Sequence, residues 1–276
     1  MNTSSQFQAP VRKYFQSSNV KLSYLDYGAA NQKVLLMLHG HMGNARTFSE
    51  LASRFVGWRV VVLDQRGHGW SEHPPERDYS RESYIIDLLT LIRQELSGQS
   101  VHMLGHSLGG INAYQFATRY PEFVTSVIVE DIGVEISGDH FEFVKNIPER
   151  SASLKELRNS LARAGLRNID YFSESAFEDE RGWGFRSDLL GMRISQRNIN
   201  GVWWRDWLGS TCPMLLIHGG KSFALDLEQA QRMAMRRPDT KLVVFEQCGH
   251  GVHSDDLDGF YKAVQAFLDE QGDGCV

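Results

Sequence analysis

Residues 101–110 read Val-His-Met-Leu-Gly-His-Ser-Leu-Gly-Gly, an apolar run that breaks into a Gly105-x-Ser107-x-Gly109 motif. The motif is typical of a nucleophile elbow, a strand-to-helix turn so tight that its central residue adopts a strained backbone. An apolar strand before it and a helix pattern after it favour this interpretation over a chance Gly- and Ser-containing loop. Ser107 would then stand at a helix N-terminus, where free N–H groups and the helix dipole favour an anionic transition state.

Composition and charge narrow the class of protein. The chain has 276 residues, of which 42% are hydrophobic and 23% charged, which excludes disordered, collagen-like and coiled-coil classes. Its net charge of -5 is scattered, so no basic face for nucleic acid is expected. Met1–Tyr14 lacks the apolar core of a signal peptide and no segment reaches the length of a membrane span, which predicts a cytoplasmic location and no membrane partner. Cys212, Cys248 and Cys275 show no metal-type spacing and are interpreted as free thiols.

Short continuous apolar runs predict strands that are covered on both faces. They are Val34–Leu38, Val60–Leu63, Val101–Leu104, Val127–Val129, Met214–Ile217 and Leu242–Phe245. Helix patterns fall between them over Asn44–Phe55, Ser80–Leu96, Leu108–Tyr120, Asp226–Arg237 and Ser254–Glu270. This alternation predicts an α/β fold with a mostly parallel, doubly wound sheet, and the runs Val11–Gln16 and Val20–Tyr27 predict an antiparallel hairpin at its edge. Functional residues should therefore follow the strand ends.

The alternation is interrupted once, between Val134 and Ser210. This stretch is too long for an ordinary connection, so we expect it to have structure of its own. It contains four of the six tryptophans and a capping box at Ser153–Glu156 that predicts a helix. We predict that residues 134–210 form a helical cap inserted in a core made of residues 1–133 and 211–276. Some of the cap's aromatic side chains are expected to line an apolar pocket, and others to hold the cap in place.

The serine of the elbow needs a base within hydrogen-bond reach, because a serine hydroxyl is a weak nucleophile near neutral pH. His250 lies between Gly249 and Gly251, just after the last apolar run, where an imidazole can reach Ser107. His250 is therefore the predicted general base. His253, three residues later, is interpreted as a pocket wall or helix residue.

The acid that orients this base has three candidates. Glu130 and Asp131 directly follow one strand, whereas Asp226 follows the next strand at a distance. Asp226-Leu-Glu-Gln229 has the form of a capping box, which already accounts for Asp226 as a helix N-cap. Asp131 has no such local role, so the sequence favours Asp131 and leaves Asp226 and Glu130 as alternatives.

An oxyanion needs preorganised N–H donors, each of which contributes about 3 kcal/mol to transition-state stabilisation. The elbow supplies the backbone N–H of Leu108, and the loop His39–Gly43 can supply that of His41. A metal site formed by His39 and His41 is the competing interpretation. No third ligand at a suitable spacing supports it, so no metal is predicted.

Together these motifs resemble the α/β-hydrolase superfamily over nearly the whole chain. The matching segments are His39-Gly40 with Gly43, Asp64–Gly69, Gly105–Gly110 and Gly249-His250, in the superfamily's order. The resemblance implies that Ser107 is the nucleophile, His250 the base, and the N–H groups of His41 and Leu108 the oxyanion donors. Serine at position 107 argues against the dehalogenase and epoxide hydrolase branches, which use aspartate there.

One loop departs from the commonest pattern of the superfamily. Many members carry the acid as Gly-x-x-Asp after the next-to-last strand, where this chain has Gly219-Gly-Lys-Ser222. Small bacterial YbfF-type carboxylesterases look similar in this loop and place the acid at the position of Asp131. That resemblance implies a capped esterase for short acyl esters or thioesters. The chain has no Gly-rich nucleotide-binding motif, so no cofactor is expected.

Three functions follow from these observations. The favoured one is a serine hydrolase that cleaves esters or thioesters through an acyl-enzyme on Ser107. The second is a carbon–carbon bond hydrolase or lyase with the same triad, and the third is a small-molecule sensor that retains the triad. The second is motivated by cap arginines that can hold an anionic substrate, namely Arg158, Arg163, Arg167, Arg186, Arg193 and Arg197.

Overall fold

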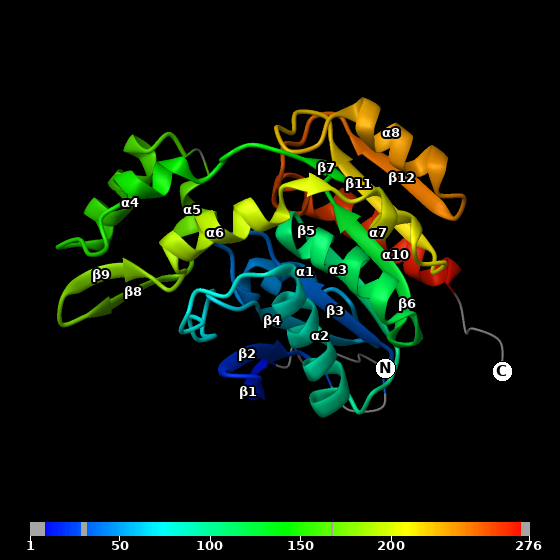
Figure 1. The fold of residues 1–276 in the computed structure, drawn as a ribbon, viewed down its shortest axis with the longest axis horizontal. Coiled ribbons are helices and arrows are strands. Elements are labelled where there is room, and N and C mark those ends of the chain that lie inside the picture. Colours follow the sequence, from blue (N-terminus) through cyan, green and yellow to red (C-terminus); the bar gives the residue numbers. More distant parts are fainter. Residues whose placement is uncertain (1–8, 29–31, 167, 272–276) are drawn as a thin grey trace, which may run out of the picture.

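The computed structural model describes residues 9–28, 32–166 and 168–271, so the predicted free thiol of Cys275 lies outside the described residues. An eight-stranded sheet with the order β1-β2-β4-β3-β5-β6-β11-β12 forms the centre (Figure 1). The strands are β1 Val11–Ser17, β2 Val20–Asp26, β3 Val34–Leu38, β4 Arg59–Asp64, β5 Val101–His106, β6 Val124–Glu130, β11 Met214–Gly219 and β12 Thr240–Phe245. β1 and β2 form an antiparallel hairpin, β2 pairs antiparallel with β4, and the other pairs are parallel. The predicted α/β sheet and its edge hairpin are confirmed.

The inner strands divide their side chains between two hydrophobic cores. In β3, Leu36 and Leu38 belong to one core, and Leu35 and Met37 to the other. This division follows from the alternation of side chains across a strand that is buried on both faces. Helices cover both faces of the sheet (Figure 1). The first core is covered by α2 (Arg81–Glu95), α3 (Leu108–Arg119) and α8 (Leu227–Arg236), and the second by α1 (Ser49–Ala52) and α10 (Leu257–Glu270).

Three sequence expectations about these elements were wrong in detail. The helix expected over residues 44–55 is a short 3-10 turn, η1 Ala45–Phe48, followed by the single turn of α1. The helix expected over residues 254–270 is divided into α9 (Val252–Asp255) and α10, because Asp256 leaves the helical region with φ −140° and caps α10 through the N–H of Gly259. β12 is only half-buried, since it is the edge strand and has a neighbour on one side.

Residues 134–210, called the insert below, connect β6 to β11 and contain both helices and strands. In order they are β7 Glu135–Ile136, η3 Glu142–Asn146, α4 Leu154–Arg163, α5 Ile169–Ser173, β8 Ala176–Asp179, β9 Gly182–Phe185, α6 Leu189–Ile199, β10 Gly201–Val202 and α7 Trp204–Leu208. The helix predicted from Ser153–Glu156 is present as α4, and Ser153 caps it by accepting from the N–H of Glu156. The reciprocal bond of a capping box is absent among the described residues, because the Glu156 carboxylate accepts from the N–H of Ala152 instead. The β8–β9 hairpin and the β7–β10 pair show that the segment is not wholly helical. α4 and the β8–β9 hairpin project away from the sheet (Figure 1).

The insert has a small core of its own and is fixed to the sheet at its end. Its core contains Ile147, Leu157, Leu161 and Phe185. Trp207 is fully buried in the main core, where its indole N–H donates to the carbonyl of Met233 at 3.0 Å. Trp207 therefore anchors the end of the insert to α8. Within the described residues, no helix is both long enough and apolar enough to cross a membrane.

Candidate active site

Ser107 lies in the tight turn between β5 and α3, with a backbone φ of +52° and ψ of −116°. A side chain at either flanking glycine would collide with the backbone. A Cβ at Gly105 would lie 2.2 Å from the carbonyl oxygen of Gly109, and a Cβ at Gly109 would lie 2.1 Å from that of Leu38. The two glycines are required for this reason, and the turn has the strained geometry that the motif predicts.

Asp131 follows β6 directly and has a positive φ of +53°, which turns its side chain toward the neighbouring strand ends. Its buried carboxylate accepts a hydrogen bond from His250 Nδ1 at 2.7 Å and one from the backbone N–H of Gly219 at 3.0 Å. The hydroxyl of Ser222 donates to the same oxygen as His250, and His218 Nδ1 lies 3.3 Å from the other oxygen. Burial opposes ionisation of Asp131, but the hydrogen bonds from His218, His250 and Ser222 and the charge of His250 hold its pKa below the usual value.

The two alternative acids have other partners. Asp226 caps α8 by accepting from the backbone N–H of Gln229 at 2.7 Å. Glu130 accepts from the backbone N–H of His253 at 2.8 Å and from its Nδ1 at 2.9 Å. Among the described residues, Asp131 is the carboxylate that hydrogen-bonds the ring of His250.

Ser107 and His250 both line one cavity of about 620 Å³. The aromatic side chains in its wall are Phe141, Phe143, Tyr171, Phe172 and Phe223, all but the last of which come from the insert. Among the described residues that line this cavity, none is a tryptophan, so the expected aromatic lining is formed by phenylalanine and tyrosine. The tryptophans of the insert pack elsewhere, as Trp207 does.

The two predicted oxyanion donors come from different segments, His41 from the loop after β3 and Leu108 from the start of α3. Among the described residues, no backbone acceptor takes the N–H of His41 or of Leu108. The side chain of His41 turns to the insert, where its Nε2 lies 2.8 Å from the hydroxyl of Ser195 in α6. That hydroxyl also lies 3.0 Å from the hydroxyl of Tyr84. Burial lowers the pKa of His41 well below its usual value, so its ring is neutral.

His39 is occupied by local hydrogen bonds. Its Nδ1 donates to the carbonyl of Gly40 at 2.7 Å, and its Nε2 accepts from the backbone N–H of Gln65 at 3.1 Å. Burial lowers the pKa of His39 to about 4, which keeps the ring neutral. Both nitrogens are therefore used, which argues against a metal site shared by His39 and His41.

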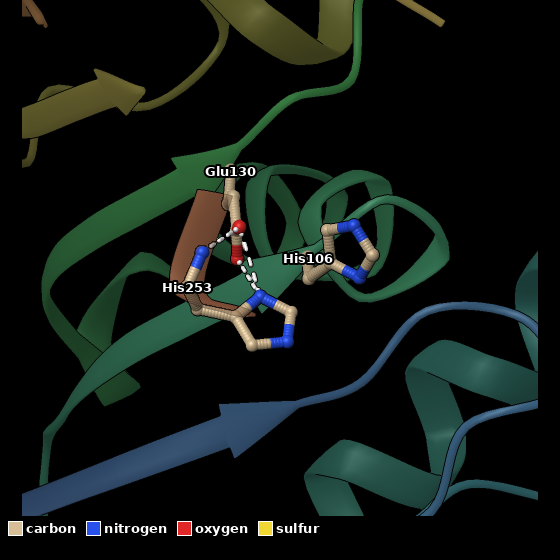
Figure 2. Close-up of side chains that lie close together, drawn as sticks. All are labelled: His106, Glu130 and His253. Carbon is tan, nitrogen blue, oxygen red and sulfur yellow. Dashed lines mark hydrogen bonds and ion pairs between the residues drawn. The ribbon is translucent and has the colours of Figure 1, made fainter. Parts of the chain in front are cut away.

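Another group of side chains that could hold a metal ion comes from β5, β6 and α9. One nitrogen or oxygen each of His106, Glu130 and His253 lie within 4.8 Å of one another, and all three residues are buried (Figure 2). Figure 2 shows the carboxylate of Glu130 facing His253, with both His253 donors bonded to it. His106 Nε2 donates to the backbone carbonyl of His250 at 2.9 Å. These hydrogen bonds tie the His250 loop to the ends of β5 and β6, while the buried Nδ1 of His106 has no hydrogen-bond partner among the described residues.

Sequence reasoning missed four residues that contact the site. His218 lies near the end of β11 and Ser222 follows that strand, so the rule that functional residues lie at strand ends could have identified them. Tyr171 and Ser195 come from the insert, where Tyr171 lines the cavity and its hydroxyl lies 3.4 Å from the carbonyl of His41. Their positions depend on how the insert packs against the rest of the chain, which local sequence patterns do not predict.

A family model described as the alpha/beta hydrolase family matches residues 35–263, which is most of the chain. The chain belongs to this family. The α/β hydrolase is 27% identical to an sn-1-specific diacylglycerol lipase of Mus musculus, over 87% of this chain and 82% of the relative. It is also 27% identical to a 2-(acetamidomethylene)succinate hydrolase of Mesorhizobium japonicum, over 86% of this chain and 88% of the relative.

Two solved structures share this fold. A crystal structure of E-2-(acetamidomethylene)succinate hydrolase superposes with a TM-score of 0.82 at 23% identity, covering 94% of this chain and 99% of that one. A marine microorganism esterase superposes with a TM-score of 0.77 at 24% identity, covering 90% and 99%. The resemblance to the superfamily is thus confirmed, whereas the narrower likeness to YbfF-type carboxylesterases stays a prediction.

Proposed function

We propose that this α/β hydrolase is a serine carboxylesterase or thioesterase that works through an acyl-enzyme on Ser107. The observation that carries the proposal is the hydrogen bond between Asp131 and His250, whose ring opens into the same cavity as Ser107. Ser107 Oγ attacks the acyl carbonyl while His250 Nε2 takes its proton, and His250 then gives that proton to the leaving alcohol or thiol. Water, activated by His250, releases the acid in the second half of the reaction.

The remaining parts of the proposed mechanism belong to Asp131 and two backbone amides. Asp131 holds the Nδ1–H tautomer of His250 and stabilises the imidazolium that forms. The lowered pKa of Asp131 supports this role, because the carboxylate stays ionised near neutral pH. The N–H groups of His41 and Leu108 receive the oxyanion. In this proposal the insert acts as a cap, since it supplies most of the aromatic wall.

The charge of the cavity favours a neutral acyl group. Among the described residues that line it, none is Lys or Arg, whereas Glu135 and Asp226 are present. The arginines of the insert that motivated a carbon–carbon bond hydrolase lie elsewhere. Arg158 pairs with Asp170, and Arg193 pairs with Asp139 and Glu142.

The other arginines of that set give no more support to an anionic substrate. Arg186 lines a different cavity, Arg163 and Arg197 are absent from the described lining, and Arg167 lies outside the described residues. The Mesorhizobium japonicum relative is named for a succinate derivative, whose carboxylates need cations that the described part of this lining lacks. A neutral ester or thioester therefore fits the cavity better.

A fluorophosphonate probe should label the intact protein at Ser107 only. The phosphonyl group reacts with a serine that a neighbouring base activates, so labelling reports the Ser107–His250 pair directly. Peptide mass spectrometry locates the adduct, and Ser107→Ala, checked for folding by circular dichroism, should abolish it. A folded wild-type protein that never labels at Ser107 would refute the proposal. If Ser107 is labelled but the protein hydrolyses no more than one equivalent of ester, the result would favour the small-molecule sensor instead.

We also expect the enzyme to discriminate between acyl groups by charge. p-Nitrophenyl butyrate should be hydrolysed with a kcat/KM about 100-fold higher than p-nitrophenyl hemisuccinate, because the added carboxylate would be buried without a cation. The two esters have acyl chains of similar length, so steric fit changes little. Initial-rate measurements with both esters decide the point, and equal values would favour an anionic substrate.

A further inference from the structure

A second cavity, of about 690 Å³, lies between the loop after β4 and the insert. Gly69 and Trp70 form part of its wall on the core side, and the β8–β9 hairpin contributes Phe177 and Phe185 from the insert. None of the proposed catalytic residues lines this cavity. It is therefore separate from the active site and has no part in the proposed hydrolysis.

Three arginines surround the Trp70 ring at the edge of this cavity. The Cζ atoms of Arg12, Arg186 and Arg46 lie 4.0, 4.4 and 4.7 Å from the centroid of the indole. Arg186 also lies 5.0 Å from the ring of Phe177. Two aromatic rings thus contact the guanidinium of Arg186, and such stacking leaves its N–H edge available to an anion.

These three arginines have only two carboxylate partners among the described residues. Arg12 pairs with Asp64 at 2.5 Å, and Arg46 lies 3.7 Å from Glu174. Among the described residues, no carboxylate lies within ion-pair distance of Arg186 and no acceptor takes its guanidinium N–H groups. Burial, with Arg12 and Arg46 nearby, lowers the pKa of Arg186, so this cationic group is held where an anion would stabilise it.

The other cations of the cavity wall are already neutralised. Arg77 pairs with Asp188, Lys145 with Glu142, Arg150 with Asp179, and Arg181 with both Glu149 and Asp179. Arg186 is therefore the one cation in the described lining that lacks a partner. An anion that enters this cavity would therefore bind at Arg186.

The apolar part of the wall consists of Val144, Ile147, Phe177, Phe185, Leu189 and Leu190. The described lining also includes three carboxylates, of which Asp188 pairs with Arg77, Glu149 pairs with Arg181, and Glu72 accepts from the backbone N–H of Lys21. The side chain of Leu190 is 50% exposed, so part of this apolar surface faces water. An apolar wall beside an unpartnered guanidinium matches a ligand with an anionic group at one end and a hydrocarbon portion at the other.

We propose that this second cavity binds an amphiphilic phosphate monoester, whose phosphate contacts Arg186 and whose hydrocarbon portion packs on the apolar wall. Arg46 and Arg12 add to the positive field around the phosphate. The ligand is a soluble alkyl phosphate or the headgroup region of an anionic lipid, which present the same chemistry.

Isothermal titration with octyl phosphate tests the proposal. The wild type should bind it more tightly than octanol or inorganic phosphate, because each of these lacks one half of the recognition. Arg186→Gln should weaken binding by about 10- to 100-fold, and Arg46→Gln, at an exposed position, should weaken it less. Arg163→Gln is the matched control, since Arg163 is exposed on α4 and away from the cavity.

Sedimentation with phosphatidylcholine vesicles, with and without phosphatidic acid, distinguishes the two sources of ligand. If the protein binds octyl phosphate but not the anionic vesicles, the ligand is a soluble alkyl phosphate. If it also sediments with the vesicles that contain phosphatidic acid, the ligand is a lipid headgroup. Ester hydrolysis by Arg186→Gln and Arg46→Gln should equal that of the wild type, which verifies folding. Equal octyl phosphate affinity in the wild type and both variants, or octanol binding as tightly as octyl phosphate, would overturn the proposal.

Discussion

Replacing Asp131 with asparagine should lower kcat/KM for ester hydrolysis by about 10⁴-fold. In the structure His250 Nδ1 lies 2.7 Å from Asp131 Oδ2, so the carboxylate selects the ring tautomer that leaves Nε2 free to accept a proton. An asparagine amide can donate to Nδ1 instead and so select the opposite tautomer. Single-turnover acylation, followed by release of p-nitrophenol, measures the step concerned.

Asp226→Asn is the matched control for this experiment. Asp226 comes from the loop that carries the acid in many α/β hydrolases, but here it caps α8 through the N–H of Gln229. Asparagine caps a helix about as well as aspartate, so folding and the acylation rate should be nearly unchanged. Rapid acylation by Asp131→Asn together with slow acylation by Asp226→Asn would show that the acid has been assigned to the wrong strand.

The difference between these two aspartates illustrates what local sequence can predict. The capping box at Asp226 and the strand before Asp131 are local patterns, and the sheet order that brings Asp131 to His250 follows from alternating strands and helices. The contact of Ser222 with Asp131 was not predicted, because it depends on the path of one loop rather than on a repeating pattern.

The insert was the least predictable part of the chain. Its aromatic residues could be found from the sequence, but their partners could not. Trp207 is buried against α8, whereas Phe141 and Tyr171 face the cavity, although all three are aromatic residues of the insert. Which aromatic side chain lines a pocket depends on tertiary packing between segments far apart in the chain. The β8–β9 hairpin was missed because its two strands are only four residues each.

Replacing Glu130 with alanine should lower the free energy of unfolding by about 3–5 kcal/mol. The buried carboxylate accepts two hydrogen bonds from His253, and alanine would leave both buried donors without this partner. Urea denaturation at neutral pH measures the change. Glu122→Ala is the control, because Glu122 is exposed, and it should alter the unfolding free energy by no more than about 0.5 kcal/mol.

The same variant should show a specific dependence on pH. Burial opposes ionisation of Glu130, but the charges of His253 and His106 and the hydrogen bonds from His253 lower its pKa below the usual value. A folded-state pKa below the unfolded one means that Glu130 stabilises the fold above the unfolded value, about 4.3, and that this contribution disappears as pH falls through the folded value. The wild-type advantage over Glu130→Ala should therefore be constant near neutral pH and shrink in acid. An advantage that grows in acid would contradict the assigned direction.

Glu130→Ala should also affect catalysis through the position of His250. Glu130 and Asp131 are adjacent at the end of β6 and hold the two ends of one turn, His253 and His250 respectively. Loss of the first contact frees the turn, so His250 samples positions away from Ser107 and kcat should fall while KM changes little. The probe should still label Ser107, only more slowly. If the variant loses stability but keeps its kcat, Glu130 stabilises the fold without positioning His250. Asp131 and His106 would then be the groups that position His250.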